Sequence, residues 1–261
     1  MILVRAIAAL LLVLAAGCAV QPPQPEVRPE RDTTGAESDD RARARIHTEL
    51  AAGYYEFGNM SVALEEVNIA LRADPNYSPA YNVAGLVYSN LKEDQLAEQN
   101  FQQALRINPL DSDANNNYGW FLCQRKREAE ALKYFADALR NPLYQNPDRT
   151  YVNAGICARQ QGDPAAAEQY FQSALKMRPG QAQALYNLAE LAYARGDFPV
   201  AKQHLDRLLK VMQPNAQVLW LGLRVERKLG DRSSEESYAY RLRTNFPQSK
   251  ETQALRAGEY E

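Results

Sequence analysis

Cysteine and histidine are the residues whose chemistry is easiest to place in a sequence, and this chain of 261 residues has few of either. It has three cysteines, Cys18, Cys123 and Cys157, and two histidines, His47 and His204. Neither histidine is spaced from a cysteine as the ligands of a zinc site are, so no metal site is predicted. Two histidines also leave little material for general-base catalysis at neutral pH.

The rest of the sequence carries no catalytic motif. It lacks a Gly-rich phosphate loop, a G-x-S-x-G elbow and an H-E-x-x-H helix. Lysine and arginine total 30 against 32 aspartate and glutamate residues, which leaves no basic field for nucleic acid. We therefore expect a protein that is not an enzyme, with no cofactor, no small-molecule substrate and no nucleic-acid partner.

A short phrase that recurs along the chain predicts the elements that position these residues. Its four copies lie 34, 34 and 36 residues apart, and a proline follows each within a few residues. The copies are Ala70-Leu71-Arg72, Ala104-Leu105-Arg106, Ala138-Leu139-Arg140 and Ala174-Leu175-Lys176, and the prolines are Pro75, Pro109, Pro142 and Pro179. A period of about 34 residues with a terminal proline is typical of stacked helix–turn–helix repeats.

Residue size alternates within each unit as two crossing helices require. Small residues (Gly85, Gly119, Gly155) precede large ones (Phe101, Phe135, Phe171) by a fixed distance, which predicts large-into-small packing. A second set of glycines, Gly58, Gly162, Gly196 and Gly230, is expected at the turn between the two helices. In the first unit the same register places Leu50, Ala51 and Tyr54 on the first helix.

Extending this register predicts an all-α domain over 41–261. Its six units start near residues 44, 78, 112, 148, 182 and 216 and run to 77, 111, 147, 181, 215 and 248, followed by a capping helix over 249–261. The pattern resembles the tetratricopeptide repeat, which implies a right-handed solenoid. A generic helical bundle is the alternative, but it has no reason to keep a 34-residue step.

The amino terminus predicts export. Arg5 precedes the apolar run Ala6–Ala16, which is too short to span a bilayer and is typical of a signal peptide, here 1–17. The following cysteine, Cys18, closes a small-residue stretch that resembles a bacterial lipoprotein processing site, which implies acylation of Cys18. Ala15 stands where that family usually has leucine, so an ordinary cleaved signal peptide is the alternative.

A flexible tether rich in proline and glutamate is expected over 18–40, because such a composition cannot build a core. The residue after the cysteine is Ala19. Lipoproteins retained at the inner membrane resemble one another in having aspartate there. We therefore expect a lipid anchor in the outer membrane of a Gram-negative bacterium, with the domain on the periplasmic side.

The other two cysteines fall late on the first helices of adjacent units. Cys123 is the twelfth residue of the third unit and Cys157 the tenth of the fourth. In an exported protein, two cysteines on helices that pack side by side can form a disulfide. Two buried free thiols are the alternative.

A partner is expected on the inner face, which the first helices of stacked units line. Positions 2, 5, 9 and 12 of the units point there, and they include both tryptophans of the chain. The predicted partner-binding groove comprises Tyr55, Asn82, Leu86, Asn116, Trp120, Ile156, Arg159, Tyr186, Tyr193 and Trp220, with Arg224 and Arg227 beyond. Trp, Tyr and Arg are enriched at interface hot spots. Alternatively, many of these aromatic side chains pack between neighbouring first helices.

Two stretches, Asn115–Cys123 and Tyr151–Cys157, resemble the type IV pilus biogenesis lipoproteins of the PilW/PilF type. The resemblance implies an outer-membrane pilotin that binds the pilus secretin subunit and promotes its localisation and multimerisation. It also implies a Cys123–Cys157 bridge between the third and fourth repeats and partner contact through the first repeats. The alternative function is a periplasmic scaffold lipoprotein for cell-wall hydrolases or outer-membrane protein assembly.

Overall fold

The computed structural model of the protein describes residues 37–260. The predicted signal peptide, Cys18 and most of the predicted tether lie outside the described residues. The chain divides after Ser38 into two units, and Asp39–Glu261 is the unit described below.

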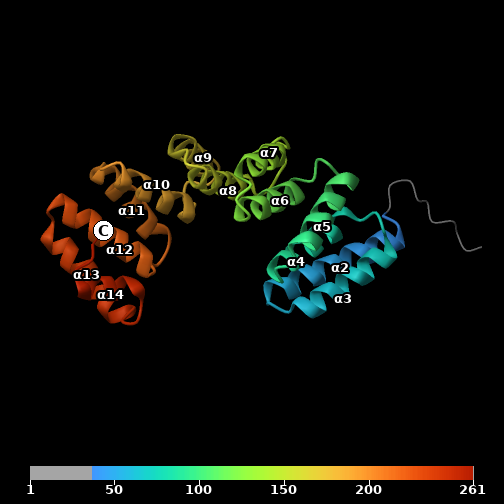
Figure 1. Cartoon of the computed structure of the whole chain (residues 1–261), viewed down its shortest axis with the longest axis horizontal. Coiled ribbons are helices and arrows are strands. Elements are labelled where there is room, and N and C mark those ends of the chain that lie inside the picture. The colour runs from blue at the N-terminus through green and yellow to red at the C-terminus, as the bar shows by residue number, and fades with distance from the viewer. Residues whose placement is uncertain (1–36, 261) are drawn as a thin grey trace, which may run out of the picture. The chain divides into compact units, whose positions relative to one another are not determined.

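This unit is built from thirteen helices in the part of the chain that the structure describes, with no strand among them (Figure 1). They pair in chain order as α2 (Asp39–Glu56) with α3 (Met60–Ala73), α4 (Ser78–Asn90) with α5 (Asp94–Ile107), α6 (Ser112–Gln124) with α7 (Glu128–Ala138), α8 (Pro147–Gln160) with α9 (Pro164–Met177), α10 (Ala182–Ala194) with α11 (Phe198–Val211), and α12 (Ala216–Leu229) with α13 (Arg232–Asn245). The short α14 (Lys250–Ala257) follows. The predicted all-α repeat fold with six units and a capping helix is confirmed.

The helix pairs stack in two layers. The first helices of the interior units, α4 to α10, pack against their own partners, against the second helix of the unit before and against the first helix of the next unit. At the two ends, α2 contacts α3 and α4, and α12 contacts α14 in place of a further unit. Among the described helices, no second helix contacts another second helix. The first helices therefore form the more closely spaced layer, which is where the sequence placed the inner face.

Glycine lets the two helices of a unit approach closely at the predicted positions. A methyl group added at Gly85 would lie 2.7 Å from the Phe101 ring, and one at Gly155 would lie 2.5 Å from Phe171. The sixth unit repeats the arrangement with Gly222 and Tyr238, at 2.6 Å. The sequence reading missed this last pair because a tyrosine takes the place of the phenylalanine.

The turn inside every unit contains one residue with left-handed backbone. Gly162 and Gly196 have φ of 88° and 83°, as expected for the residue type that adopts this conformation without strain. In the second and third units, however, Lys92 and Lys126 hold the same position with φ of 65° and 59°. Position in the repeat, not the presence of glycine, therefore fixes this turn.

The helix α2 begins at Asp39, two residues before the predicted start of the domain at 41. Asp39 and Asp40, assigned to the tether from composition, form the first turn of α2. Acidic residues stabilise a helix amino terminus through their interaction with the helix dipole, which explains why these two belong to the helix.

The carboxy-terminal end of the stack is closed by α14. Ser249 caps this helix, and the Thr252 hydroxyl donates to the carbonyls of Leu242 at 3.2 Å and Phe246 at 2.8 Å. Leu255 packs into the cluster of Leu242. The cap thus covers the apolar edge that the sixth unit would otherwise expose.

Candidate functional site

The residues of the predicted groove all lie on first helices, from Tyr55 on α2 to Trp220 on α12. They do not form one continuous site. In the amino-terminal half, polar groove residues bond to one another across the first helices. In the carboxy-terminal half, aromatic and charged side chains gather around hollows.

An amide network ties together the first helices α4, α6 and α8. The Asn117 side chain donates to Asn82 Oδ1 at 3.1 Å, and Thr150 and Asn153 both donate to Asn116 Oδ1 at 3.0 Å. Asn82 is buried, with 8 % of its surface exposed. The network uses the carboxamides of Asn82 and Asn116 to hold neighbouring helices, so the expectation that Asn82 faces a partner is wrong.

The apolar groove residues of this half also serve packing. Leu86 and Trp120 pack, half-buried, against the cluster around Phe101 and Phe135, and Tyr55 packs against the cluster of the first unit. The alternative that aromatic side chains fill the space between first helices therefore applies here. Only part of each of these side chains is exposed to solvent.

Cys123 and Cys157 form a disulfide that joins α6 to α8. Their Cα atoms are 5.8 Å apart and both side chains are buried. Of the two states that the sequence left open, the structure has the bridge. It crosses the junction where the repeat step lengthens to 36 residues, at the irregular loop before α8.

The fourth and fifth units share a charged and aromatic cluster on the inner layer. Arg159 on α8 forms a 2.8 Å ion pair with Glu190 on α10, and the Tyr186 hydroxyl donates to the same carboxylate at 2.9 Å. Burial, followed by the charge of Glu190, raises the pKa of Tyr186. Ile156, Arg159 and Tyr186 line a hollow of about 370 Å³ whose floor includes Met212.

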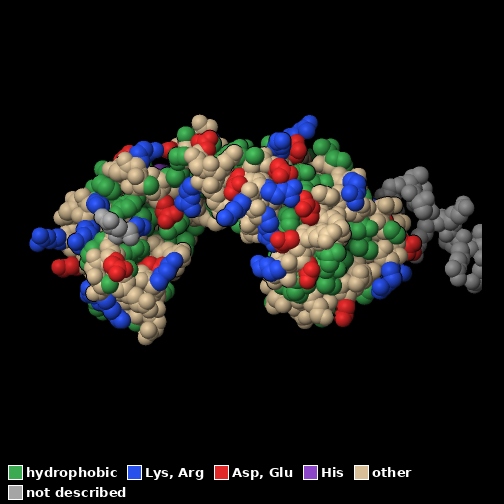
Figure 2. All heavy atoms as spheres, in the orientation of Figure 1, with side chains coloured by type: hydrophobic (Ala, Val, Ile, Leu, Met, Phe, Trp, Pro, Cys, Tyr) green, Lys and Arg blue, Asp and Glu red, His purple; other side chains and the backbone are tan. Residues whose placement is uncertain are grey.

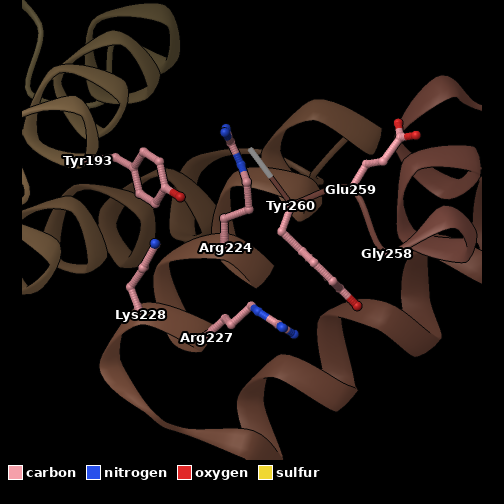
Figure 3. A pocket seen from close by; sticks show the side chains of 7 residues that line it. All are labelled: Tyr193, Arg224, Arg227, Lys228, Gly258, Glu259 and Tyr260. Atoms are coloured by element: carbon pink, nitrogen blue, oxygen red, sulfur yellow. The ribbon is translucent and has the colours of Figure 1, made fainter.

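A second cluster lies on the fifth and sixth units, and Figure 3 shows the pocket that it forms. The guanidinium carbon of Arg224 lies 4.7 Å from the ring centre of Tyr193 and 5.9 Å from that of Trp220. Tyr260 stacks on Trp220 with centroids 5.9 Å apart, and its ring lies 3.8 Å from Arg227. The structure thus brings the predicted Tyr193 and Trp220 together with both arginines.

An exposed apolar face on α2 is the feature that the groove prediction missed. Ile46, Leu50, Tyr54 and Phe57 are 49 %, 44 %, 36 % and 89 % exposed. Ile46, Leu50 and Tyr54 are four residues apart and therefore lie on one side of α2, and Phe57 follows in the turn directly after the helix ends at Glu56. We call these four residues the apolar face of α2. In Figure 2, hydrophobic side chains gather over the first unit.

The exposure has a simple cause. In later units the residues that correspond to Leu50 pack against the second helix of the unit before, and Ala84, Tyr118 and Ala154 are buried there. No unit precedes α2 among the described residues. The signal was available in the sequence, because apolar residues in packing register on the first unit lack a neighbour to pack against.

Charges are mixed over the visible surface, where basic and acidic side chains alternate without a field of one sign (Figure 2). Within residues 37–260, no group of three or more metal-ligating side chains is present and no helix is both long and apolar enough to cross a bilayer.

Comparison with known proteins places this architecture. Profiles of the tetratricopeptide repeat match residues 78–109, 110–180 and 158–221. The type IV pilus assembly protein PilF of Pseudomonas aeruginosa is 30 % identical over 218 residues, which cover 84 % of this chain and 86 % of that protein. The chain belongs to the PilF family.

Solved structures agree with this membership. The crystal structure of PilW, described as a widely conserved type IV pilus biogenesis factor, is 34 % identical and superposes with a TM-score of 0.74 over 81 % of this chain and 97 % of PilW. The structure of Pseudomonas aeruginosa PilF is 28 % identical, with a TM-score of 0.78 over 85 % of this chain and all of PilF. This PilF-family member is a tetratricopeptide protein of type IV pilus biogenesis, and proteins of this kind are interaction modules without enzymatic activity.

Proposed function

We propose that this PilF-family protein is an outer-membrane pilotin. It is anchored on the periplasmic side through an acylated Cys18, binds the secretin subunit of the type IV pilus and promotes its localisation and multimerisation. The lipoprotein-like sequence before Cys18 and membership of a pilus-biogenesis family support this role.

The exposed apolar face of α2 carries the proposal. Single exposed apolar residues are ordinary, but several on one side of one helix are typical of a contact surface. We expect a subunit that will span the membrane to expose an apolar band until it assembles. Ile46, Leu50, Tyr54 and Phe57 would cover such a surface, and burial of apolar area stabilises the contact by about 25 cal/mol per Å².

The position of this face in the chain suits the task. The helix α2 follows directly on the predicted tether, so the unit that binds the subunit is also the unit nearest the anchor. A coil of about 20 residues reaches roughly 25 Å. A bound subunit would therefore be held within a short distance of the bilayer in which it must assemble.

The amount of secretin multimer in the cell, measured on a non-reducing gel, tests this proposal. Three strains carry Cys18→Ala, the double variant Leu50→Asp with Phe57→Asp, and Leu143→Asp. The first two remove the anchor and the apolar face, and we expect both to lose most of the multimer. Leu143, 78 % exposed in the loop before α8, is the matched control and should leave multimers unchanged.

Normal multimers in the Cys18→Ala strain would contradict the pilotin role. Normal multimers in the α2 double variant would contradict the assignment of the contact to α2. Detergent-solubilised outer membranes supply a second test. Recovery of cell-wall hydrolases without secretin, on pull-down of the lipidated protein, would favour the scaffold function instead.

A further inference from the structure

The pocket around Arg224 holds a positive charge that forms no ion pair with any residue that the structure describes. Arg224 is partly buried between the rings of Tyr193 and Trp220, and its Nε is buried without a hydrogen-bond acceptor. Within residues 37–260 it has no ion-pair partner. A buried donor without an acceptor is costly, which is a reason to look for a ligand that supplies one.

The ion pairs of the neighbouring residues show which cations near the pocket lack a partner. Arg159, two units before, is paired with Glu190, and Arg227 is paired with Glu235 at 2.9 Å. Lys228, on the helical turn after Arg224, also lines the pocket and has no ion pair in the described part of the chain. Figure 3 shows the Glu259 carboxylate directed away from both. Among the described residues, Arg224 and Lys228 are thus the cations of the pocket that have no ion-pair partner.

The walls limit the kind of anion. Tyr193 and Tyr260 enclose the two cations in a pocket of about 620 Å³, large enough for two or three side chains but too small for a folded domain. A guanidinium held against aromatic rings presents its N–H groups in a plane that matches a carboxylate. The aromatic walls favour an apolar or aromatic side chain next to that carboxylate.

We propose that this pocket, formed by Tyr193, Arg224, Lys228 and Tyr260, binds an acidic segment of a protein partner. Arg224 holds a carboxylate of the segment, Lys228 adds a second contact, and an adjacent aromatic side chain packs against the two tyrosines. The site lies on the fifth and sixth units and involves none of the α2 residues, so it goes beyond the pilotin proposal and does not depend on it.

The two tryptophans of the chain make a direct assay possible. Trp120→Phe leaves Trp220 as the single tryptophan, and Trp220 lies beside Arg224. The probe is an acetylated, amidated hexapeptide of alternating aspartate and phenylalanine, added to the full-length protein in detergent. The matched probe replaces each aspartate with asparagine. Saturable change in Trp220 emission measures binding.

We expect the aspartate peptide to bind and the asparagine peptide to bind at least tenfold more weakly, because only the first supplies a carboxylate. Arg224→Gln and Lys228→Gln should each weaken binding at least fivefold. Arg243→Gln, an exposed arginine on α13, is the matched control and should not change it. The exposed position of Lys228 keeps its variant informative even if Arg224→Gln disturbs the local packing.

Several outcomes would overturn the proposal. Equal affinity for the two peptides would show that the carboxylate is not recognised. If neither Lys228→Gln nor Arg224→Gln changes the affinity for the aspartate peptide, the peptide binds outside this pocket. If inorganic phosphate or vesicles containing phosphatidylglycerol change Trp220 emission and displace the peptide at lower concentration, the pocket is a phosphate site and not a peptide site.

Discussion

The two ends of this repeat array are finished in different ways. At the carboxy-terminal end, α14 covers the sixth unit and Leu255 joins its core. At the amino-terminal end, Ile46 and Leu50 on α2 and Phe57 just after it are exposed within the part of the chain that the structure describes. Each interior unit buries apolar surface on both sides, so an end without a cap keeps one side exposed. This difference in exposure is the reason that we propose the amino-terminal end as a contact surface.

The two ends also differ in the chemistry that they expose. The surface of α2 is apolar, whereas the last two units present arginine, lysine and tyrosine around a pocket. An apolar face selects by shape and area, and a cationic pocket selects by charge. The two proposals therefore assign partner segments of unlike chemistry to opposite ends of the sequence.

Loss of the cap should give the largest effect. Leu255→Ala removes a side chain that is 8 % exposed and should lower the free energy of unfolding by about 2–5 kcal/mol. Leu50→Ala on α2 should change it by less than about 0.5 kcal/mol, since the side chain already faces water. Urea unfolding of the two variants measures both values. Equal losses would show that α2 is covered as α14 is.

The disulfide tests whether the two ends behave as one body. Replacing both Cys123 and Cys157 by serine should cost about 2–4 kcal/mol, since the bridge restricts the unfolded chain. Because units contact only their neighbours, the amino-terminal and carboxy-terminal halves should then lose hydrogen-exchange protection separately. A reductant should reproduce the effect in the natural protein and add nothing in the double variant. Unchanged joint protection would argue against this coupling.

Glycine packing distinguishes the interior from the open end. Gly155→Ala would force a methyl group to 2.5 Å from Phe171 and should destabilise by about 1–3 kcal/mol. Gly53→Ala on α2 meets no atom within 4 Å and should stabilise by about 0.5–1 kcal/mol, because alanine favours the helix. Thermal unfolding of this pair reports the sign. A loss at Gly53 would mean that α2 is packed more closely than its exposure suggests.

The turns should give the smallest effect. Lys92→Gly relieves a left-handed backbone in the amino-terminal half and should stabilise by about 0.5–1 kcal/mol. Gly196→Ala, at the same place in the fifth unit, should destabilise by about the same amount. Denaturant midpoints measure the two changes. A loss for Lys92→Gly would show that the lysine side chain makes a compensating contact.

Sequence reasoning predicted the packing inside units better than the surface between them. Gly155 and Phe171 were paired correctly because their spacing repeats in other units. Asn82 was assigned to a partner, yet it bonds to Asn117, 35 residues away in the next unit. Whether a polar side chain faces a binding partner or another amide depends on the residues of the neighbouring first helices. The position of a residue in its own repeat does not specify those neighbours.

The sequence by itself determined the repeat, the number of its copies and the pairing of small with large residues. These features depend on local spacing, and each occurs in several units, so the spacing can be recognised from the sequence. The tertiary structure decided which surfaces stay open. Within residues 37–260, it showed α2 without a preceding unit, α14 as a cap, and the Nε of Arg224 buried between two rings without an acceptor. The reason is physical: exposure and charge compensation are set by what stacks against a residue, and in a repeat array that neighbour lies a whole unit away in sequence.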